Sequence, residues 1–330
     1  MSIEKISVII PVLNEEKYIE NCLNSLLFQD YPKENLEILL IDGMSNDATV
    51  EIIKKYTNKY SFIKLLLNPK KTVQYALNIG IENAQGEYIV RMDAHASYAP
   101  NYVSKCIEFL KKTGAANVGG PTIVKGESFI QKIIAAAYNS PFALGGSRHY
   151  EKNFEGYADT VAWGTFKKQT LVDLGMYDER LPRSEDDDLN FRITRSGGEI
   201  FITPEIKSIY YPKDSFKKLF IQYFNYGLWK VAVIKKHRKP SRLAHLVPML
   251  FVAFIAVFGI LSFVSKFFLY VFTSIMALYL AIDFYFSFNN KYAKKLTKKV
   301  ALMLAHLIIH VSYGLGFWVG IFKFWNTRWG

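Results

Sequence analysis

The chain has 330 residues and a formal net charge of +12; 50% of the residues are hydrophobic and 15% are aromatic. This length allows a catalytic domain and a second module. Excess positive charge suits nucleic acids, anionic membrane surfaces or phosphorylated substrates. The basic clusters at 235–239 and 291–299 adjoin apolar segments, which favours a membrane surface. No zinc-finger or RNA-binding signature is present, so we expect no nucleic-acid partner.

The two cysteines and the first apolar run restrict the cellular context. Cys22 and Cys106 have neither the pattern of a disulfide framework nor a metal-ligand spacing, so we expect buried, reduced thiols. The run 6–13 is too short for a secretory signal and contains Pro11. We therefore expect the N-terminal domain to stay on the cytosolic side.

The first 115 residues alternate between strand and helix signals. Short β-branched or aliphatic runs predict strands, and amphipathic segments between them predict helices. The predicted strands are 6–10, 36–41, 63–67 and 88–92, and the predicted helices are 14–28, with Asn14 as N-cap, 48–60, 72–82 and 100–111. This alternation predicts a parallel sheet with helices on both faces. Ligands bind such sheets beyond the carboxyl ends of the strands, where Asp42 and Asp93 are predicted to lie.

Residues 117–195 give weaker signals. We expect a strand-like piece ending at Gly119-Gly120-Pro121, a mobile loop at 140–156 and a strand-like piece at 161–166. Three helices are predicted, at 129–138, 168–174 and 184–195. The last begins with four acidic residues, 185–188, which the helix dipole favours.

Three apolar runs follow, at 243–264, 267–288 and 300–322, and each is long enough to span a bilayer as a helix. The basic flanks at 235–242 and 291–299 should be cytosolic. The C-terminus is then outside if all three runs cross, although one run could instead lie in the interface. The competing interpretation is a very hydrophobic soluble helical domain. We expect His306 and His310 to be packed histidines within the membrane and not a metal-binding pair. We expect Asp283 to lie at the membrane interface.

Several motifs at the predicted strand ends resemble family-2 glycosyltransferases with the GT-A fold. The matching pieces are 8–15, 41–47 and 84–95, and the resemblance continues through Gly164 and Glu185-Asp186 to about Trp229, about two-thirds of the chain. The Asp93-Ala94-His95 variant, followed by membrane helices, is most similar to the subgroup of succinoglycan-type exopolysaccharide glucosyltransferases. The resemblance implies an α/β fold with a Rossmann-like mixed sheet and C-terminal transmembrane helices. It divides the chain into a cytosolic domain, 1–240, and a membrane domain, 241–330, with nucleotide-sugar binding in 1–115 and the acceptor side and interfacial helices in 116–240.

The Asp93-Ala94-His95 sequence lies where the family has its Asp-x-Asp metal motif. Side chains at i and i+2 point the same way from a strand end, so Asp93 and His95 could share a divalent ion. Such an ion would neutralise charge on a leaving diphosphate. Histidine makes the site softer and favours Mn²⁺ over Mg²⁺. Two alternatives remain: Asp93 alone ligates the metal, or Asp93 is an ordinary strand-end carboxylate and His95 an ordinary surface residue.

The resemblance also implies a nucleotide pocket. Asp42 would accept a hydrogen bond from the base, and Pro11, Asn14 and Glu15 would line the same pocket. Lys71, or its neighbour Lys70, would pair with the diphosphate. The structural alternatives are a turn cap for Asp42 and a solvated lysine pair.

A second signature, Glu185-Asp186, implies the catalytic carboxylates, with Asp186 as the general base. This chemistry needs an ionised carboxylate that takes the proton of the acceptor hydroxyl on the face opposite the leaving group. Four adjacent acids leave the alternative of a helix N-terminus that merely carries charge, and crowding raises the pKa of such groups.

The segment Gln222–Lys230 departs from the family's processive motif, Gln-x-x-Arg-Trp, because its spacing differs. We therefore expect the addition of a single sugar, and this segment also has the pattern of an amphipathic interfacial helix. The sequence 145–149 lacks the Gly-Lys-Ser/Thr ending of a P-loop and is a candidate acceptor-side lid.

The expected activity is inverting transfer from a nucleotide-diphosphate sugar, UDP-linked by resemblance, to a lipid-linked (polyprenyl phosphate) acceptor in polysaccharide biosynthesis. The expected location is the cytoplasmic membrane, in contact with its lipids, with several spans. One alternative is a polyprenyl- or dolichol-phosphate sugar synthase. Another is a non-catalytic membrane scaffold or lipid-binding protein.

Overall fold

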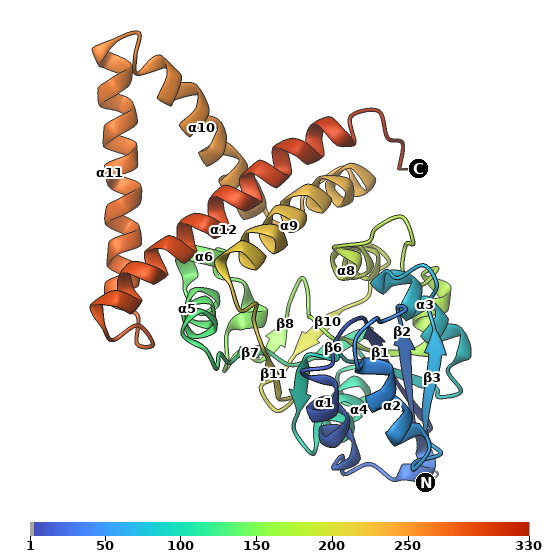
Figure 1. The fold of residues 1–330 in the computed structure, drawn as a ribbon. Coiled ribbons are helices and arrows are strands. Elements are labelled where there is room, and N and C mark those ends of the chain that lie inside the picture. Colours follow the sequence, from blue (N-terminus) through green and yellow to red (C-terminus); the bar gives the residue numbers. More distant parts are fainter. Residues whose placement is uncertain (1–2, 330) are drawn as a thin grey trace. The chain divides into compact units, whose positions relative to one another are not determined.

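The computed structural model describes residues 3–329, which form two compact units (Figure 1). Unit 1 contains the chain up to Ile123 together with Arg148–Tyr210, and unit 2 contains Val124–Ser147 together with the chain from Tyr211 onward. The unit boundary therefore differs from the compositional boundary expected at residue 240. The reason is that helix α9 (Phe216–His237) packs along helix α12 (Leu296–Lys323) and belongs with it.

Unit 1 is built on a mixed sheet with the strand order β3-β2-β1-β4-β9-β6-β10-β8. The strands are β1 (Ile6–Val12), β2 (Leu36–Asp42), β3 (Ile63–Leu67), β4 (Tyr88–Arg91), β6 (Asn117–Gly119), β8 (Gly156–Tyr157), β9 (Thr165–Lys167) and β10 (Ile200–Ile202). The first four are parallel, as the sequence predicts. Strand β9 runs antiparallel to both β4 and β6, and β8 runs antiparallel to β10. The predicted mixed α/β sheet is confirmed.

Helices cover both faces of this sheet, and a second, smaller sheet adjoins it. The helices of unit 1 are α1 (Ile19–Leu27), α2 (Thr49–Thr57), α3 (Val73–Asn83), α4 (Tyr102–Thr113), α7 (Lys168–Asp173) and α8 (Glu185–Arg195), with single turns η1 (Lys33–Asn35) and η2 (Arg148–Tyr150). The smaller sheet has the order β5-β11-β7, with β5 at Ala96–Tyr98, β11 at Ser208–Tyr210 and β7 at Thr122–Val124.

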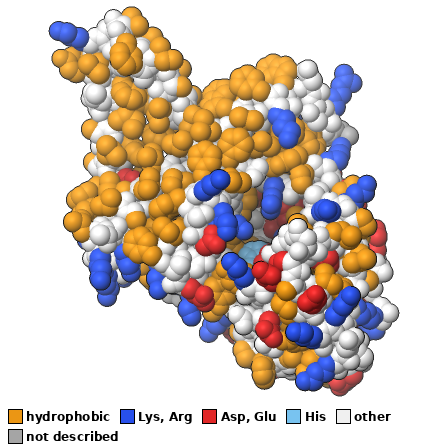
Figure 2. All heavy atoms as spheres, in the orientation of Figure 1, with side chains coloured by type: hydrophobic (Ala, Val, Ile, Leu, Met, Phe, Trp, Pro, Cys, Tyr) orange, Lys and Arg blue, Asp and Glu red, His pale blue; other side chains and the backbone are white. Residues whose placement is uncertain are grey.

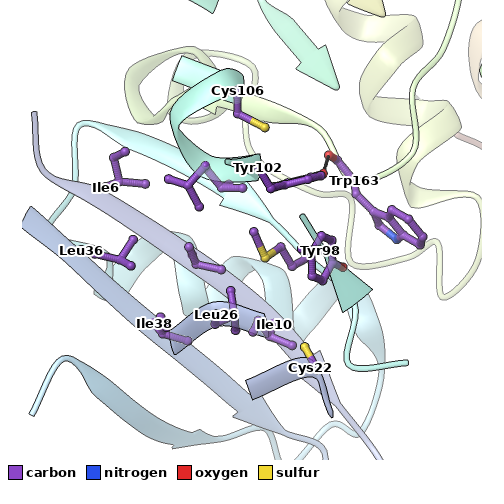
Figure 3. Packing of buried hydrophobic residues seen from close by; sticks show 14 of the residues in the cluster. Ile6, Ile10, Cys22, Leu26, Leu36, Ile38, Tyr98, Tyr102, Cys106 and Trp163 are labelled. Atoms are coloured by element: carbon purple, nitrogen blue, oxygen red, sulfur yellow. Dashed lines mark hydrogen bonds between the residues drawn. The ribbon is translucent and has the colours of Figure 1, made fainter. Parts of the chain in front are cut away.

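The alternation of side chains along β1 divides the core into two layers. Ile6 and Ile10 pack with α1 and α4 on one face, which Figure 3 shows, whereas Ile9 packs with α3 on the other. This is the period of two that a strand buried on both faces requires. Cys22 and Cys106 are free and fully buried in the first layer, and burial raises the pKa of both thiols. The expectation of buried, reduced cysteines is confirmed.

Two local expectations were wrong because residues adopt left-handed backbone conformations. Asn14 has φ 55° and does not cap a helix; α1 begins only at Ile19, after a turn. Trp163 has φ 48°, so the predicted strand 161–166 shortens to β9. The predicted loop 140–156 contains a four-residue helix, α6 (Pro141–Leu144), and η2.

Unit 2 is helical. Besides α6, α9 and α12 it contains α5 (Phe129–Tyr138), the turn η3 (Leu243–Leu246), α10 (Val247–Leu261) and α11 (Lys266–Phe288). Within residues 3–329, three helical segments are long and apolar enough to cross a membrane: Leu243–Leu261, Lys266–Phe288 and Leu296–Lys323. Their surroundings differ, because 0%, 6% and 50% of their most apolar windows are buried. Hydrophobic side chains cover the arm formed by α10 and α11 in Figure 2.

Glycines allow α9 and α12 to approach at backbone distance. A Cβ added to Gly316 would lie 1.9 Å from the carbonyl oxygen of Phe224, and one added to Gly227 would lie 2.0 Å from that of Tyr313. Neither position has room for any side chain. By contrast, Gly259 in α10 has only the ring of Phe272 nearby, at 3.9 Å from the added Cβ.

We predict opposite effects for two matched alanine substitutions. Alanine favours a helix over glycine by about 1 kcal/mol, so Gly259→Ala should leave the melting temperature unchanged or raise it. Gly316→Ala should lower it, because overpacking costs about 1–3 kcal/mol. Thermal unfolding of the two variants in the same detergent measures this difference. Equal melting temperatures would contradict the close packing of α9 on α12.

Candidate active site

Four parallel strands deliver polar residues to one edge of the unit 1 sheet. Asn14 and Glu15 follow β1, Asp42 ends β2, Lys71 follows β3 and Asp93 follows β4. The register aligns these ends, because Val12 pairs with Asp42, which in turn pairs with Leu67. The carboxyl edge of such a sheet is where ligands of α/β proteins bind.

Asp42 forms the centre of a turn at this edge. Its side chain is buried and accepts hydrogen bonds from the Ser45 hydroxyl at 2.6 Å and the Ser45 N–H at 3.1 Å. The Asn14 side chain accepts from the Asn46 N–H at 2.9 Å, which ties the β1 and β2 loops together. These contacts match the turn-cap alternative for Asp42 and hold its carboxylate in a fixed position.

Pro11 and Lys71 flank the same turn. Pro11 lies within β1, opposite Ile41. Lys71 has φ 63°, and its Cα would lie 3.4 Å from a Cβ added to Gly43, so its backbone adjoins the residue after Asp42. The structure therefore groups Pro11, Asn14, Asp42 and Lys71 at one end of the sheet edge.

His95 lies between two carboxylates. Its Nδ1 is 3.1 Å from Glu15 Oε1, and its Nε2 is 4.0 Å from Asp93 Oδ2. Tyr98 fixes the loop, because its hydroxyl accepts the Asp93 N–H at 2.6 Å and donates to the Asp93 carbonyl at 3.2 Å. Burial raises the pKa of Tyr98 well above its usual value, so this hydroxyl keeps its proton.

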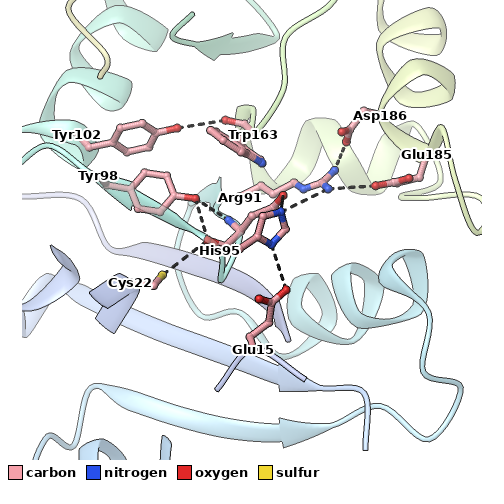
Figure 4. A network of polar contacts seen from close by, with 10 residues as sticks. Glu15, Cys22, Arg91, His95, Tyr98, Tyr102, Trp163, Glu185 and Asp186 are labelled. Carbon is pink, nitrogen blue, oxygen red and sulfur yellow. Dashed lines mark hydrogen bonds and ion pairs between the residues drawn. The ribbon is translucent and has the colours of Figure 1, made fainter. Parts of the chain in front are cut away.

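Arg91, the last residue of β4, reaches Glu185 and Asp186 of helix α8 (Figure 4). Its guanidinium is buried, donates to Glu185 Oε1 at 3.0 Å and pairs with the Asp186 carboxylate. The same group lies 3.7 Å from Asp93 Oδ1. One cation thus joins the carboxylate after β4 to both carboxylates of the second signature.

The electrostatics of this cluster keep Arg91 charged. Burial alone would lower the pKa of the guanidinium. The nearby carboxylates of Asp93 and Glu185 raise this pKa by more, so it lies above its ordinary value. The Tyr177 ring lies 5.9 Å from the guanidinium carbon, and burial raises the pKa of Tyr177 to about 12. The neutral Tyr177 ring on one side and the carboxylates on the other hold the planar guanidinium of Arg91 in one orientation.

The acids at the start of α8 have different surroundings. Asp188 is fully buried and pairs with Arg192, one turn later, at 2.9 Å. Glu185 is buried against Arg91, whereas the Asp186 side chain is 32% exposed and can meet a substrate. These acids are therefore more than a charged helix N-terminus.

The donor atoms at Asp93 and His95 fit a divalent ion. Both side chains are partly exposed, and a carboxylate with an imidazole suits Mn²⁺ or a similar metal. Among residues 3–329, no three His, Cys, Asp or Glu side chains are grouped as a complete metal site. A metal held by these two side chains alone would keep other coordination positions open for phosphate oxygens or water.

Sequence reasoning did not assign a role to Arg91. The available signal was a cation within a strand whose other residues, Tyr88, Ile89 and Val90, are apolar and buried. A buried arginine needs anionic partners, so its position two residues before Asp93 was informative. Its partners in α8 are about 95 residues away and could not be located from spacing alone.

Comparison with known proteins places unit 1 in a family. Residues 7–167 match the family model for glycosyl transferase family 2. The chain is 35% identical over 240 residues to a dolichyl N-acetyl-α-D-glucosaminyl phosphate 3-β-D-2,3-diacetamido-2,3-dideoxy-β-D-glucuronosyltransferase of Methanococcus voltae, covering 70% of this chain and 74% of the relative. It is 31% identical over 244 residues to the succinoglycan biosynthesis protein ExoA of Rhizobium meliloti, covering 73% and 74%.

Among solved structures, the chain is similar to the mannosyltransferase PcManGT of Pyrobaculum calidifontis, whose structure holds GDP-mannose and Mn²⁺. The TM-score is 0.64 at 17% identity, covering 93% of this chain and 87% of the other. This likeness, together with the mixed sheet, confirms the GT-A fold predicted from the sequence. The chain belongs to glycosyltransferase family 2 and is a glycosyltransferase.

Proposed function

We propose that unit 1 transfers one sugar from a nucleotide-diphosphate donor to a lipid-linked acceptor, with inversion at the anomeric carbon. The observation that carries this proposal is the Arg91 bridge between Asp93 and Asp186. It connects the candidate diphosphate end of the site to a partly exposed carboxylate on a different element. An inverting transfer needs these two groups on opposite sides of the reacting carbon.

Asp186 is the proposed general base. It takes the proton of the acceptor hydroxyl as that oxygen bonds to the anomeric carbon, and the bond between this carbon and the diphosphate oxygen breaks. Its partly exposed side chain gives an acceptor access, and the Arg91 contact fixes its position. Glu185 completes the pairing of Arg91 and positions the guanidinium.

The donor would occupy the sheet edge. Asp42 is proposed to accept from the nucleotide base, with Pro11, Asn14 and Glu15 lining the pocket and Lys71 facing the diphosphate. A UDP-sugar is the proposed donor, by the resemblance of the motifs. Asp93 and His95 would hold Mn²⁺ or Mg²⁺, which supplies positive charge to the leaving diphosphate.

The acceptor proposal rests on the relatives and on unit 2. The Methanococcus voltae relative is named for a dolichyl-phosphate-linked sugar acceptor, and ExoA for succinoglycan biosynthesis. Apolar helices α10 and α11 would keep the enzyme at the cytoplasmic membrane as a multi-pass protein, with unit 1 cytosolic, where a polyprenyl-phosphate-linked acceptor resides. A polyprenyl- or dolichol-phosphate sugar synthase is the alternative. The acidic cluster around Arg91 speaks against a non-catalytic scaffold.

The base assignment is tested by two isosteric substitutions in one helical turn. Asp186→Asn should lower kcat by about 10²–10⁴-fold, the usual contribution of a general base, with little change in donor KM. Asp187→Asn removes a charge from the next position and should retain most activity. The assay is release of UDP by full-length protein in membranes supplied with a lipid extract. Equal losses in both variants would contradict the assignment of Asp186.

The positioning role of Arg91 is tested by substitutions that distinguish its positive charge from its ability to donate two hydrogen bonds at once. Arg91→Lys keeps the cation but loses bidentate pairing, so kcat should fall by about 10²-fold, as expected for a misplaced base. Arg91→Met leaves buried carboxylates unpaired and should destabilise unit 1 by about 3–5 kcal/mol. Arg180→Met breaks the half-exposed pair with Asp178 and should cost about 0–1 kcal/mol. Steady-state kinetics and thermal unfolding measure these effects, and wild-type kinetics in Arg91→Lys would exclude the positioning role.

The metal proposal predicts that EDTA abolishes turnover and that Mn²⁺ restores it. His95→Ala should raise the Mn²⁺ concentration needed for half-maximal activity, because one ligand is lost. His95→Asp should restore binding and shift the preference toward Mg²⁺, a harder ion. His245→Ala, at a histidine in the turn η3 of unit 2, serves as the control. An unchanged metal response in His95→Ala would leave Asp93 as the proposed ligand and remove His95.

A further inference from the structure

Helices α9 and α12 run in the same direction, and this constrains the path of the chain through a membrane. Their contacts advance together along both helices: Phe224 meets Gly316, Leu228 meets Gly320, and the Lys235 ammonium donates to the Trp325 carbonyl at 2.7 Å. Figure 1 shows the two helices side by side. Whatever layer α12 occupies, α9 shares it over this length.

The first half of α12 is fixed by the α5–α6 segment. His310 Nε2 is 2.9 Å from the Phe142 carbonyl oxygen, and the Phe142 ring packs edge-on against His306 and His310 at 5.4 and 4.9 Å. Both ends of this segment connect to unit 1, at Val124 and Ser147. Its helices have 10 and 4 residues, far short of the roughly 20 that a membrane span needs.

Helices α10 and α11 form an antiparallel hairpin. Phe251 packs on Tyr279 at 4.4 Å, Phe254 on Phe272 at 5.9 Å, and Phe258 on Phe268 at 5.9 Å, so the numbers rise on one helix as they fall on the other. Phe263 at the tip is 93% exposed. The hairpin is predominantly apolar, with Lys266 at its tip and Asp283 near its base, and its two helices lie almost entirely outside the protein interior.

Among the described residues, the contacts of α12 with this hairpin involve the start of α10, from Pro248 to Val252, and the second half of α11, from Tyr279 onward. The Trp318 indole N–H donates to the Met249 carbonyl at 3.1 Å, in the first turn of α10. His306 Nδ1 is 2.7 Å from Asp283 Oδ1, near the end of α11, and Ser287 donates to the same carboxylate at 3.1 Å. Helix α12 therefore passes across the base of the hairpin, and does not pack along its length as a third span of a bundle would.

Chain direction excludes α12 as a span. If α12 crossed the bilayer, α9 would cross with it in the same direction, because the two are packed in parallel. An antiparallel hairpin returns the chain to the side from which it left, so α12 would begin on the side where α9 ends. It would then have to cross in the direction opposite to α9, which contradicts the parallel packing.

The charges at the helix ends agree with this exclusion. Both α9 and α12 carry lysine near both ends: Lys217, Lys218, Lys235 and Lys236 in α9, and Lys298, Lys299 and Lys323 in α12. A spanning helix would place one such end on the non-cytosolic side, against the distribution of basic residues around membrane helices. Anionic headgroups on one surface satisfy both ends of both helices.

We propose that α10 and α11 are the two membrane spans, and that α9 and α12 form a platform in the headgroup layer on the side of unit 1. The partner of this platform is the surface of a bilayer that contains anionic lipids. Residues after α12 then lie on the same side as unit 1, whereas three spans would place them on the opposite side.

The test uses full-length single-cysteine additions in sealed membrane vesicles of known orientation, with a membrane-impermeant maleimide. Wild-type protein is the control and should stay unlabelled, because Cys22 and Cys106 are fully buried. The added positions are exposed: Glu51→Cys in unit 1, Val264→Cys at the hairpin tip, Lys294→Cys between α11 and α12, and Thr327→Cys after α12.

We expect Glu51→Cys, Lys294→Cys and Thr327→Cys to be labelled in one vesicle orientation and Val264→Cys only in the other. Thr327→Cys labelled together with Val264→Cys would overturn the proposal in favour of three spans. Labelling of all four from one side would also overturn it, because the hairpin would not cross. A reporter enzyme fused after the C-terminus, active on one side only, gives the same answer without a cysteine. Labelling does not depend on catalysis, so failure here is distinguishable from failure of the proposed transfer reaction.

Discussion

A single buried guanidinium determines how the candidate active site is arranged. Arg91 ends a central strand and meets carboxylates from its own loop and from α8, which lies about 95 residues later in the chain. Without this cation, Asp93, Glu185 and Asp186 would be three neighbouring negative charges, and their repulsion would separate the elements that carry them. With it, the proposed base and the proposed metal ligand are held at a fixed separation. Because Arg91 is buried and paired with three carboxylates, these groups are already held together in the structure without a bound substrate.

The sequence was sufficient to predict the parts of unit 1 that depend on local periodicity. The four parallel strands, the cysteine environment and the strand-end positions of Asp42 and Asp93 follow from short apolar runs and their end signals. The contacts of Asp42 show the limit of such reasoning, because its hydrogen bonds to Ser45 depend on a turn conformation that composition does not specify. Strand β9 shows it too: three residues that follow a left-handed Trp163 enter the sheet antiparallel, between two strands from elsewhere in the chain. The role of Arg91 depends on the same long-range pairing.

In unit 2, the hydropathy of a helix is not enough to predict where that helix lies relative to the membrane. The three apolar runs are similar in composition, and hydropathy identifies each as a candidate span. Their neighbours differ, because glycines at 227, 316 and 320 bring α9 onto α12, whereas α10 and α11 pack together through aromatic rings and leave most of their surface outside the protein interior. Hydropathy indicates whether a segment can lie in hydrocarbon. Packing shows how much of its surface is not already covered by protein and can contact lipid. An apolar helix that already buries half of its most hydrophobic window against protein has less need of hydrocarbon around it.

The stereochemistry of the product tests the central claim most directly, because inversion requires one displacement by an acceptor activated on the face opposite the leaving group. The anomeric configuration of the sugar in donor and product is measured by proton NMR of the isolated glycolipid product. Asp186 acting as a base across from the diphosphate predicts that the configuration is inverted, so that an α-linked donor gives a β-linked product. Retention of the donor's configuration would contradict this arrangement and require a different role for Asp186.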